Sequence, residues 1–353
     1  MNKLLIIYGS TATGKTDLGV LLAKRFNGEI VSADSRQVYK GMDIGTGKDI
    51  PPNSKVKSQN AKLQFKSQKF TIGFREKVGI PIWLVDICEP DYRFNVGEYQ
   101  KLAKLAIAEI WSRGKLPIII GGTGLYIRSL IEPLDMMRIP PNISLRQKLD
   151  TYSIDALQKE LQQLNLNRFQ HMNESDRHNP RRLIRAIEVA MFQKIFPSYS
   201  SSEGIPYGIP ESRSSLKASS RPHSNNNILL IGLTTSQEEL EKRIDQRVEK
   251  RMQQGIITEI ESMLKKGYVW KLPSMSALGY REWKEYFEAS SNKEALKKNI
   301  IRLWKLHERQ YAKRQMTYFK KMKGTNWFDI TEDSYINRIL DRVETWYNKN
   351  KEA

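Results

Sequence analysis

Eight residues near the start of the chain constrain its fold more than any others. They read Gly-Ser-Thr-Ala-Thr-Gly-Lys-Thr and fit the pattern G-x-x-x-x-G-K-[ST]. The apolar run Leu4–Tyr8 precedes them, and a helical pattern that begins at Asp17 follows. A strand that passes through a glycine turn into a helix aims backbone N–H groups and the positive end of the helix dipole at one point. The sequence therefore predicts a phosphate or diphosphate site, with added charge from Lys15 and a magnesium ligand from Thr16. Its residues are Gly9, Ser10, Thr11, Ala12, Thr13, Gly14, Lys15 and Thr16.

Short apolar runs alternate with helical patterns along most of the chain. The runs are Leu4–Tyr8, Glu29–Ser32, Ile82–Ile87, Pro117–Ile120 and Ile228–Leu233. This alternation is typical of a parallel sheet that carries helices. We therefore expect an α/β fold, namely a P-loop NTPase-like parallel sheet flanked by helices.

An inserted smaller helical lobe is expected between the last two predicted strands. Helical patterns cover Leu145–Leu166 and Arg181–Gln193, and the second pattern carries Leu183 and Ile187 on one apolar face. The polar segment 53–69 has no clear period and is expected to be an inserted loop or irregular hairpin. The expected segments are a core at 1–137 and 179–353, the lobe at 138–178, and a flexible linker or surface loop, rich in Ser, Pro, Gly and Asn, at 197–227.

Other features of the sequence exclude whole classes of protein. Leu4–Tyr8 is too short for a signal peptide or a membrane span, so we expect a cytoplasmic protein that does not enter a membrane. Cys88 is the single cysteine, which excludes intrachain disulfides and thiolate zinc clusters, and its expected place is the apolar interior. The four histidines are too scattered to indicate a metal site.

The chain is strongly basic, and the charge is uneven. It has 58 Lys and Arg against 39 Asp and Glu, a net charge of +19. Residues 293–323 read as a long basic helix, whose Trp304, Tyr311 and Tyr318 recur every seventh residue. We favour a core-facing seam for these three rings over base-stacking platforms. The cations on the other faces favour a partner with a phosphate backbone.

Two aspartates compete for a role beside the phosphates. Asp34 follows the predicted strand Glu29–Ser32, and Asp86 ends the apolar run Pro81–Val85. The carboxyl ends of neighbouring parallel strands open onto one crevice, which would place Asp34 near the phosphate loop. A turn or N-cap carboxylate is an equal alternative for Asp34. Asp86 stands where nucleotide hydrolases and kinases hold magnesium through water, so spacing leaves both roles open.

Motif-like segments follow one another along the chain. They are Gly9–Thr16, Asp34–Tyr39, Gly41–Lys48, Gly121–Tyr126, Asn179–Leu183 with Arg185 and Ala186, Ala277–Glu282, and Lys313–Tyr318. Together they resemble the signatures of the bacterial tRNA dimethylallyltransferases, which prenylate the adenosine immediately 3′ of the anticodon. The resemblance covers most of the chain and implies two substrates, dimethylallyl diphosphate and the anticodon stem-loop of tRNA. We expect the enzyme to be a monomer.

The resemblance also implies a mechanism and catalytic residues. Diphosphate would be the leaving group, stabilised by Lys15, the loop amides and Mg²⁺ at Thr16. Asp34 matches the family's base, which accepts the proton of the adenine N6 amine. Thr11 matches an active-site threonine beside the donor.

Two further sets of residues follow from the resemblance. Arg243 and Arg247 match basic side chains that reach the diphosphate, on a helix that Ser236 and Glu239 would cap. Pairing of Glu239 with Arg243 in solvent is the alternative. The residues expected along the bound RNA are Asp34, Ser35, Arg36, Gln37, Thr123, Arg146, Asn179, Pro180, Arg181, Arg182, Leu183, Ala277, Leu278, Gly279, Tyr280, Arg281, Glu282, Lys313, Arg314, Gln315 and Lys320.

Three other functions remain open. A phosphate-loop kinase of a small metabolite would use Asp86 and turn over a nucleoside triphosphate without RNA. An adenylate isopentenyltransferase would prenylate free AMP with the same loop and base. A noncatalytic RNA-binding protein would bind tRNA without consuming the donor, although the intact Lys15, Thr16 and Asp34 argue against it.

Overall fold

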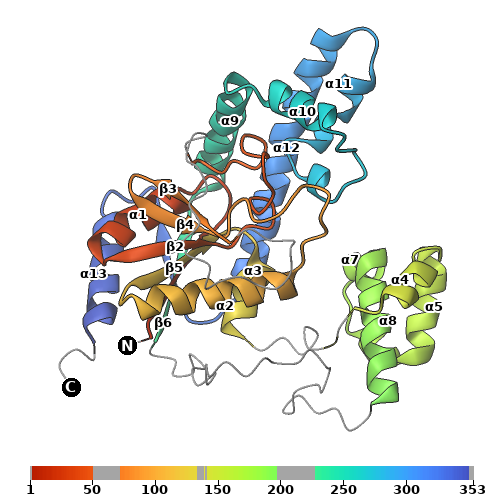
Figure 1. The fold of residues 1–353 in the computed structure, drawn as a ribbon, viewed down its shortest axis with the longest axis horizontal. Helices are drawn as coiled ribbons and strands as arrows, with labels where there is room; N and C mark the ends of the chain where they lie inside the picture. The colour runs from red at the N-terminus through yellow and green to blue at the C-terminus, as the bar shows by residue number, and fades with distance from the viewer. Residues whose placement is uncertain (1, 51–71, 133–138, 140, 197–226, 350–353) are drawn as a thin grey trace. The chain divides into compact units, whose positions relative to one another are not determined.

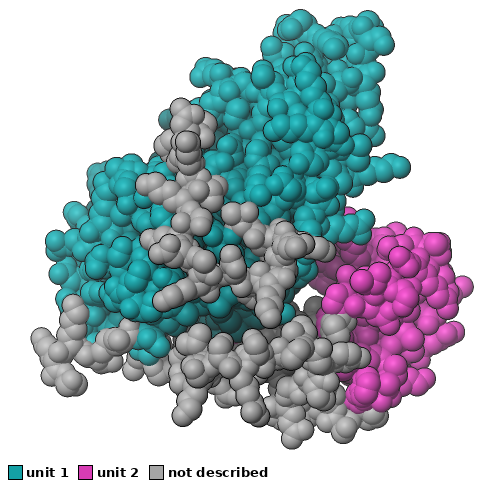
Figure 2. Space-filling view, in the orientation of Figure 1, with its two compact units in different colours: residues 1–131, 218–353 teal, residues 132–217 magenta. Residues whose placement is uncertain are grey.

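The computed structural model describes residues 2–50, 72–132, 139, 141–196 and 227–349. It divides into two compact units (Figures 1 and 2). The first unit comprises residues 1–131 and 218–353, and the second comprises residues 132–217. The predicted linker at 197–227, except Asn227, and the predicted loop at 53–69 lie outside the described residues.

A seven-stranded sheet forms the framework of the first unit within the described residues. The strand order is β3-β4-β2-β5-β1-β6-β7, and every pair is parallel except β3 with β4. The α/β fold with a parallel sheet is therefore confirmed. The predicted apolar runs overlap five of these strands, although the run Ile82–Ile87 shares only Ile82 and Trp83 with β4. The strands are β1 Leu4–Gly9, β2 Gly28–Ser32, β3 Phe74–Lys77, β4 Ile80–Trp83, β5 Leu116–Gly121, β6 Ile228–Thr234 and β7 Thr325–Asp329.

Helices cover both faces of this sheet (Figure 1). Residues of β1 alternate between two apolar clusters, with Ile6 and Tyr8 in one and Leu5 and Ile7 in the other. Helices α2, α3 and α12 pack into the first cluster, and α1 and α13 into the second. The helices of this unit are α1 Lys15–Arg25, α2 Val96–Ser112, α3 Gly124–Ile131, α9 Gln237–Gln253, α10 Ile256–Lys265, α11 Lys284–Glu288, α12 Lys293–Phe319 and α13 Tyr335–Asn348, with 3-10 turns η3 Ser274–Ser276 and η4 Arg281–Trp283.

The long basic helix predicted at 293–323 is α12, and its three regularly spaced rings have different surroundings. Trp304 is completely buried, as a core-facing seam predicts. Tyr318 is half-buried and packs so closely on Gly124 that a Cβ there would lie 2.2 Å from the ring. Tyr311 instead lines a cleft of about 1150 Å³ in this unit. The seam prediction therefore holds for Trp304 but not for Tyr311.

The second unit is a helical lobe with its own apolar core. Leu157 and Leu161 of α5 pack there with Leu183 and Ile187 of α8. Because these side chains share one core, α8 belongs to the lobe, although the sequence analysis assigned residues from 179 onward to the sheet-bearing core. The helices are α4 Ile143–Leu149, α5 Ile154–Leu164, α6 Leu166–Gln170, α7 Glu174–Arg177 and α8 Pro180–Ile195.

The single helix predicted at 145–166 is in fact two helices, α4 and α5. The break falls at residues 150–153, where the Ser153 side chain accepts a hydrogen bond from the Ala156 N–H and so begins α5. The cap at Ser153 therefore starts a new helix, although the apolar residues of 145–166 repeat with one continuous helical period. Among the described residues, no helix is both long enough and apolar enough to cross a membrane.

Candidate active site

The phosphate loop connects β1 to α1, as the sequence predicts. Gly14 lies at the N-cap of α1 with φ 77°, a conformation that glycine adopts without steric cost. Gly9 has no room for a side chain, because a Cβ there would lie 2.5 Å from the Leu233 carbonyl oxygen of β6. The Thr13 hydroxyl donates a 2.9 Å hydrogen bond to the Ser10 carbonyl oxygen. The loop is therefore stabilised on the side away from the cleft by Gly9, Ser10 and Thr13. The loop residues that line the cleft are Thr11, Ala12, Gly14, Lys15 and Thr16.

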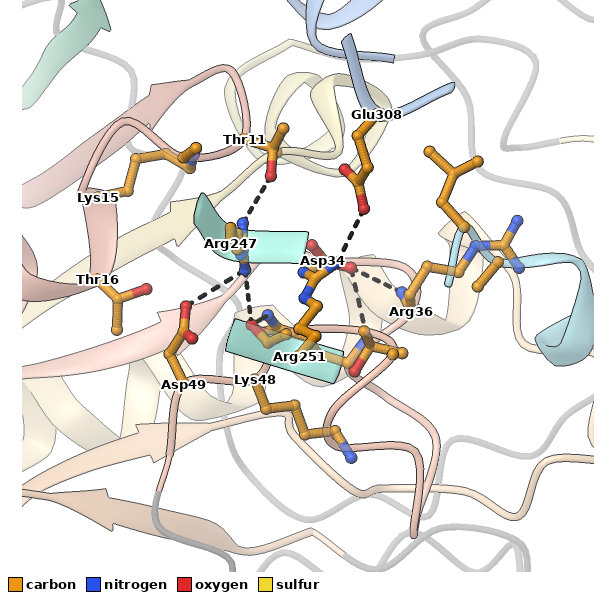
Figure 3. Close-up of a pocket in the computed structure, with 18 of the residues that line it drawn as sticks. Thr11, Lys15, Thr16, Asp34, Arg36, Lys48, Asp49, Arg247, Arg251 and Glu308 are labelled. Atoms are coloured by element: carbon orange, nitrogen blue, oxygen red, sulfur yellow. Dashed lines mark hydrogen bonds and ion pairs between the residues drawn. The ribbon is translucent and has the colours of Figure 1, made fainter. Parts of the chain in front are cut away.

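A cleft of about 1150 Å³ opens in front of this loop, within the first unit. Residues that follow β2 and β5 join the loop in its walls, as expected where the carboxyl ends of parallel strands meet. Helices α9 and α12 supply further residues of these walls, including Arg247 and Gln315. The side chains of Lys15, Thr16, Asp34 and Arg247 gather around this cavity (Figure 3).

Helix α9 brings a row of arginines to the cleft at every fourth residue: Arg243, Arg247 and Arg251. The Arg247 guanidinium donates to the Thr11 hydroxyl at 2.6 Å and to the Gly47 carbonyl oxygen at 3.0 Å. Arg243 lines the cleft, where the resemblance placed it. It also donates to Glu239 at 2.6 Å, so the alternative i,i+4 pair is present as well. Ser236 caps this helix, as predicted, by accepting from the Glu239 N–H at 3.2 Å. The Glu239 side chain, predicted to share in the cap, binds Arg243 instead.

Arg251 and its partner Glu308 of α12 were missed by the sequence analysis. Their 2.8 Å ion pair lies in the wall of the cleft, and both side chains are buried. Burial and the neighbouring Arg247 charge lower the pKa of Arg251. The two arginines also leave no space at Gly47, since a Cβ there would lie 2.1 Å from Arg251 Nη2 and 2.3 Å from Arg247 Nη2. Such contacts join segments far apart in the chain, which no local pattern reveals.

Lys15 carries an unusual pKa for a lysine. Burial and the nearby Arg247 charge lower the pKa of Lys15 to about 7, while Asp34 and Asp49 oppose this shift. Its Nζ donates to the Ser10 carbonyl oxygen within the loop. A phosphate anion at the loop would favour the charged ammonium form, so binding of such an anion would be coupled to protonation of Lys15.

Asp34 is both a turn residue and a cleft residue. Its Oδ1 accepts hydrogen bonds from the Arg36 N–H at 2.8 Å and the Gln37 N–H at 3.4 Å, so the turn role left open by the sequence is real. The same carboxylate lines the cleft with Lys15. Within the described residues, its Oδ2 accepts no hydrogen bond, which leaves this oxygen available to accept a proton.

Asp86 does not lie in the cleft wall. It is 1% exposed and pairs with Lys48 and Arg75, which occupy its two oxygens. Burial raises the pKa of Asp86, although the two cations oppose the shift. These contacts remove the structural support for Asp86 as a magnesium-holding residue of a kinase.

The segment Gly41–Lys48 is held in place by Glu259 of α10, another residue that the sequence analysis missed. The Glu259 carboxylate accepts hydrogen bonds from the backbone N–H groups of Asp43, Ile44 and Gly45 at 2.8 to 3.1 Å. It also accepts a 2.5 Å hydrogen bond from the Tyr280 hydroxyl. Tyr280 thus contacts protein, not solvent, and is completely buried.

The other residues predicted to contact RNA in the first unit fall into three groups. Those in the cleft wall are Asp34, Ser35, Arg36, Gln37, Ala277, Leu278, Arg281, Arg314 and Gln315. Lys313 of α12 and Lys320, the residue that follows this helix, are exposed outside it. Thr123, Gly279, Tyr280 and Glu282 also lie outside the wall, and they bind other protein groups. For example, the Thr123 hydroxyl accepts from the Ser35 N–H at 3.0 Å, and Glu282 accepts from the Gly279 N–H at 3.0 Å.

Most of the RNA contacts predicted in the second unit bind or pack against other groups of the protein. Arg146 binds the buried Glu188 through two hydrogen bonds of 2.6 and 2.7 Å. Burial alone would raise the pKa of Glu188, but the arginines that bind it hold this pKa below its ordinary value. Asn179 caps α8, Pro180 occupies its first turn, and Leu183 is completely buried. Of the remaining two, Arg182 pairs with Asp176 and Arg181 is exposed.

Comparison with known proteins gives a consistent result. The family model described as IPP transferase matches residues 66–322, and the model described as isopentenyl transferase matches residues 2–65. A tRNA dimethylallyltransferase of Anoxybacillus flavithermus is 36% identical over 341 residues, which is 97% of this chain and 94% of the relative.

Solved structures agree with the sequence comparison. The full-length tRNA isopentenylpyrophosphate transferase from Bacillus halodurans is 31% identical, with a TM-score of 0.62 over 100% of this chain and 99% of the other. A eukaryotic dimethylallyltransferase solved acting on tRNA shares the fold, with a TM-score of 0.72 at 22% identity over 99% of this chain and 80% of the other. This chain therefore belongs to the IPP transferase family of bacterial tRNA dimethylallyltransferases, which are prenyltransferases.

Proposed function

We propose that this enzyme transfers the dimethylallyl group of dimethylallyl diphosphate to N6 of the adenosine immediately 3′ of the anticodon in tRNA, and releases diphosphate. The observation that carries this proposal is the shared cleft, which brings a phosphate loop, an arginine that binds Thr11, and the Asp34 carboxylate together. The names of the relatives point to the same substrate class.

The arrangement provides for both halves of a substitution reaction. The allylic carbon–oxygen bond breaks and its electron pair leaves with diphosphate, whose growing charge Lys15, the loop amides and Arg247 stabilise. The N6 lone pair forms the new carbon–nitrogen bond, and Asp34 accepts the N6 proton. Lys15 and Arg247 therefore act on the diphosphate of the donor, and the Asp34 carboxylate acts on the adenine of the acceptor.

The chemistry of the donor set fits a magnesium ion. The Thr16 hydroxyl lines the cleft together with the Asp34 and Asp49 carboxylates, and Mg²⁺ is commonly held by one or two carboxylates plus substrate phosphates. Thr16 would be its protein ligand in the loop. A bound ion would add positive charge beside the leaving diphosphate.

The acceptor base must leave the anticodon stack, because its N6 atom cannot meet the donor while it is stacked. Arg314, Arg36 and Arg281 line the cleft, and Lys313 and Lys320 extend the positive surface along α12. We expect these cations to bind the stem-loop backbone. All described residues that line the cleft belong to one unit of a single chain, so a monomer suffices. A tRNA substrate implies a cytoplasmic enzyme.

The direct test is incubation with unmodified tRNA and labelled dimethylallyl diphosphate, followed by mass analysis of the nucleosides. We expect one N6-dimethylallyladenosine per reactive tRNA. Turnover of a nucleoside triphosphate without RNA would instead support the kinase. Binding of tRNA without any consumption of the donor would support the noncatalytic RNA-binding protein.

The lowered pKa of Lys15 predicts a pH-dependent affinity for diphosphate. Lys15 is about half charged at pH 7, and a bound anion would raise its pKa, so binding above pH 7 takes up a proton. Affinity for inorganic diphosphate should then fall by up to about tenfold per pH unit above pH 7. Calorimetric titrations at pH 6.5, 7.5 and 8.5 would measure this fall.

The matched control for the pH series is Lys15→Arg, which keeps its charge at every pH used. Diphosphate itself ionises in this range, and comparison of the two proteins cancels that contribution. Parallel pH dependences for the two proteins would contradict a titrating Lys15.

The basic face of α12 should contribute to tRNA affinity more than to chemistry. Replacing Lys313, Arg314 and Lys320 by alanine should raise the KM for tRNA and change turnover at saturating tRNA little. The slope of log affinity against log salt should fall by about 1 for each RNA phosphate that the variant no longer binds. Filter binding at several salt concentrations would measure the slope.

A control variant removes the same total charge elsewhere. Lys24, Lys101 and Lys266 are exposed on α1, on α2 and just after α10, and none lines the cleft. Their triple alanine variant should retain most of the tRNA affinity and the wild-type salt slope. Equal losses in the two triple variants would mean that net charge, not the α12 face, attracts the RNA.

A further inference from the structure

Gln315 of α12 is buried beside the phosphate loop, and both ends of its amide bind the protein. Its Oε1 accepts a 2.8 Å hydrogen bond from the Thr11 N–H. Its Nε2 donates a 2.8 Å hydrogen bond to the Gly122 carbonyl oxygen, just after β5. The side chain is 7% exposed. One amide therefore connects the phosphate loop, the end of a central strand and the helix that carries the basic face.

The amide of Gln315 is closely packed against the protein. A Cβ at Gly122 would lie 2.2 Å from Gln315 Nε2, so the amide packs directly on this glycine backbone. A buried amide that fills such a gap cannot turn outward without leaving its own polar atoms and those of its partners unsatisfied. Gln315 is thus poorly placed to contact a bound RNA, although it lies beside Arg314 in the sequence.

Thr11 is held from two sides. Gln315 fixes its backbone N–H, and Arg247 donates to its hydroxyl at 2.6 Å. Arg247 in turn reaches the Gly47 carbonyl oxygen at 3.0 Å. A shift of Thr11 would therefore also shift the guanidinium that faces the phosphate loop.

We propose that Gln315 is a positioning residue of the donor site, which sets the phosphate loop at Thr11 for diphosphate binding and makes no contact with tRNA. This inference rests on the proposed function for the identity of the donor. It assigns Gln315 a role different from the RNA contact expected from the resemblance. Two residues of α12 thus have different surroundings: Lys313 is exposed to solvent, and Gln315 faces the phosphate loop.

The test variant is Gln315→Met, which keeps the length of the side chain and removes both hydrogen bonds. Because a misplacement of about 1 Å can cost about a hundredfold in rate, we expect single-turnover prenylation to fall between about 10-fold and 100-fold. Affinity for inorganic diphosphate should fall with it, and the Kd for the stem-loop alone should stay within about twofold of wild type. The matched variant on the same helix is Lys313→Gln, which should weaken stem-loop binding and leave diphosphate binding unchanged.

Each result decides between the two roles. A raised Kd for the stem-loop with unchanged diphosphate binding would make Gln315 an RNA contact and overturn the proposal. Wild-type behaviour of Gln315→Met in both assays would overturn it as well. Diphosphate binding is measured without RNA or prenyl transfer, so the proposal about Gln315 can be judged even if tRNA prenylation is not found.

A double-mutant cycle guards against a general loss of folding. Thr11→Val removes the hydroxyl that Arg247 binds but keeps the N–H that Gln315 binds. If Gln315 acts by positioning Thr11, the losses in diphosphate affinity caused by the two substitutions should be clearly less than additive when combined. Fully additive losses would show that Gln315 does not act through Thr11. A melting temperature that falls in proportion to the loss of affinity would show that Gln315 only stabilises the fold.

Discussion

Replacing Asp34 by asparagine should leave tRNA binding intact and slow the chemical step about a hundredfold or more, the usual size of a general-base contribution. The structure shows why this substitution separates the role of Asp34 in the turn from its role as a base. The Asp34 Oδ1 atom accepts from the Arg36 N–H, and an asparagine side-chain oxygen can accept the same bond. The turn should therefore survive while the proton acceptor is lost. Single-turnover prenylation with both substrates saturating would measure the effect.

Asp49→Asn is the matched control, because Asp49 is another carboxylate of the cleft and pairs with Arg247 at 3.3 Å. It should affect donor binding more than the chemical step. Unchanged chemistry in Asp34→Asn would refute the assignment of the base. Loss of both donor and tRNA binding would show that Asp34 is needed only for the turn.

An anticodon stem-loop with adenosine 3′ of the anticodon should react far more efficiently than AMP, ADP or ATP. We expect a ratio of kcat/KM of at least about a thousand, because cations remote from the reacting atoms orient the flipped base. Lys313 and Lys320 are exposed outside the cleft, where a free nucleotide could not use them. Competition between labelled AMP and the stem-loop would give the ratio directly.

A stem-loop with guanosine at the same position provides the control. It keeps the phosphate backbone and should bind with similar affinity, yet it lacks the exocyclic N6 amine and should yield no product. Similar specificity constants for AMP and the stem-loop would instead place the enzyme among free-nucleotide prenyltransferases.

Local sequence patterns predicted the parts of the fold that local forces determine. The phosphate loop, the cap at Ser236 and the five apolar strands follow from residues close together in the chain. The pattern missed β3, a four-residue strand in which Arg75 and Lys77 interrupt any apolar run. The charge of Arg75 is tolerated in this buried strand because it pairs with Asp86. This contact forms only in the folded chain.

The candidate site was predictable to a similar extent. Asp34 and Arg247 lie in one cleft with the loop, as the sequence and the resemblance together indicated. The supporting contacts were not predictable, because they join residues distant in sequence, as Glu259 joins Gly45 and Gln315 joins Thr11. For the same reason, several residues expected along the RNA proved to have partners within the protein.

The position of β1 in the sheet has a consequence for the synthesis of the chain. This first strand pairs with β5 on one edge and with β6 on the other, and the whole helical lobe is encoded between β5 and β6. On the ribosome, one edge of β1 would thus stay open for about 5 to 20 s at usual elongation rates, while the lobe is made. During that interval an apolar strand with unpaired N–H and C=O groups is exposed to other nascent chains. We therefore expect newly made protein to depend on chaperones until β6 emerges.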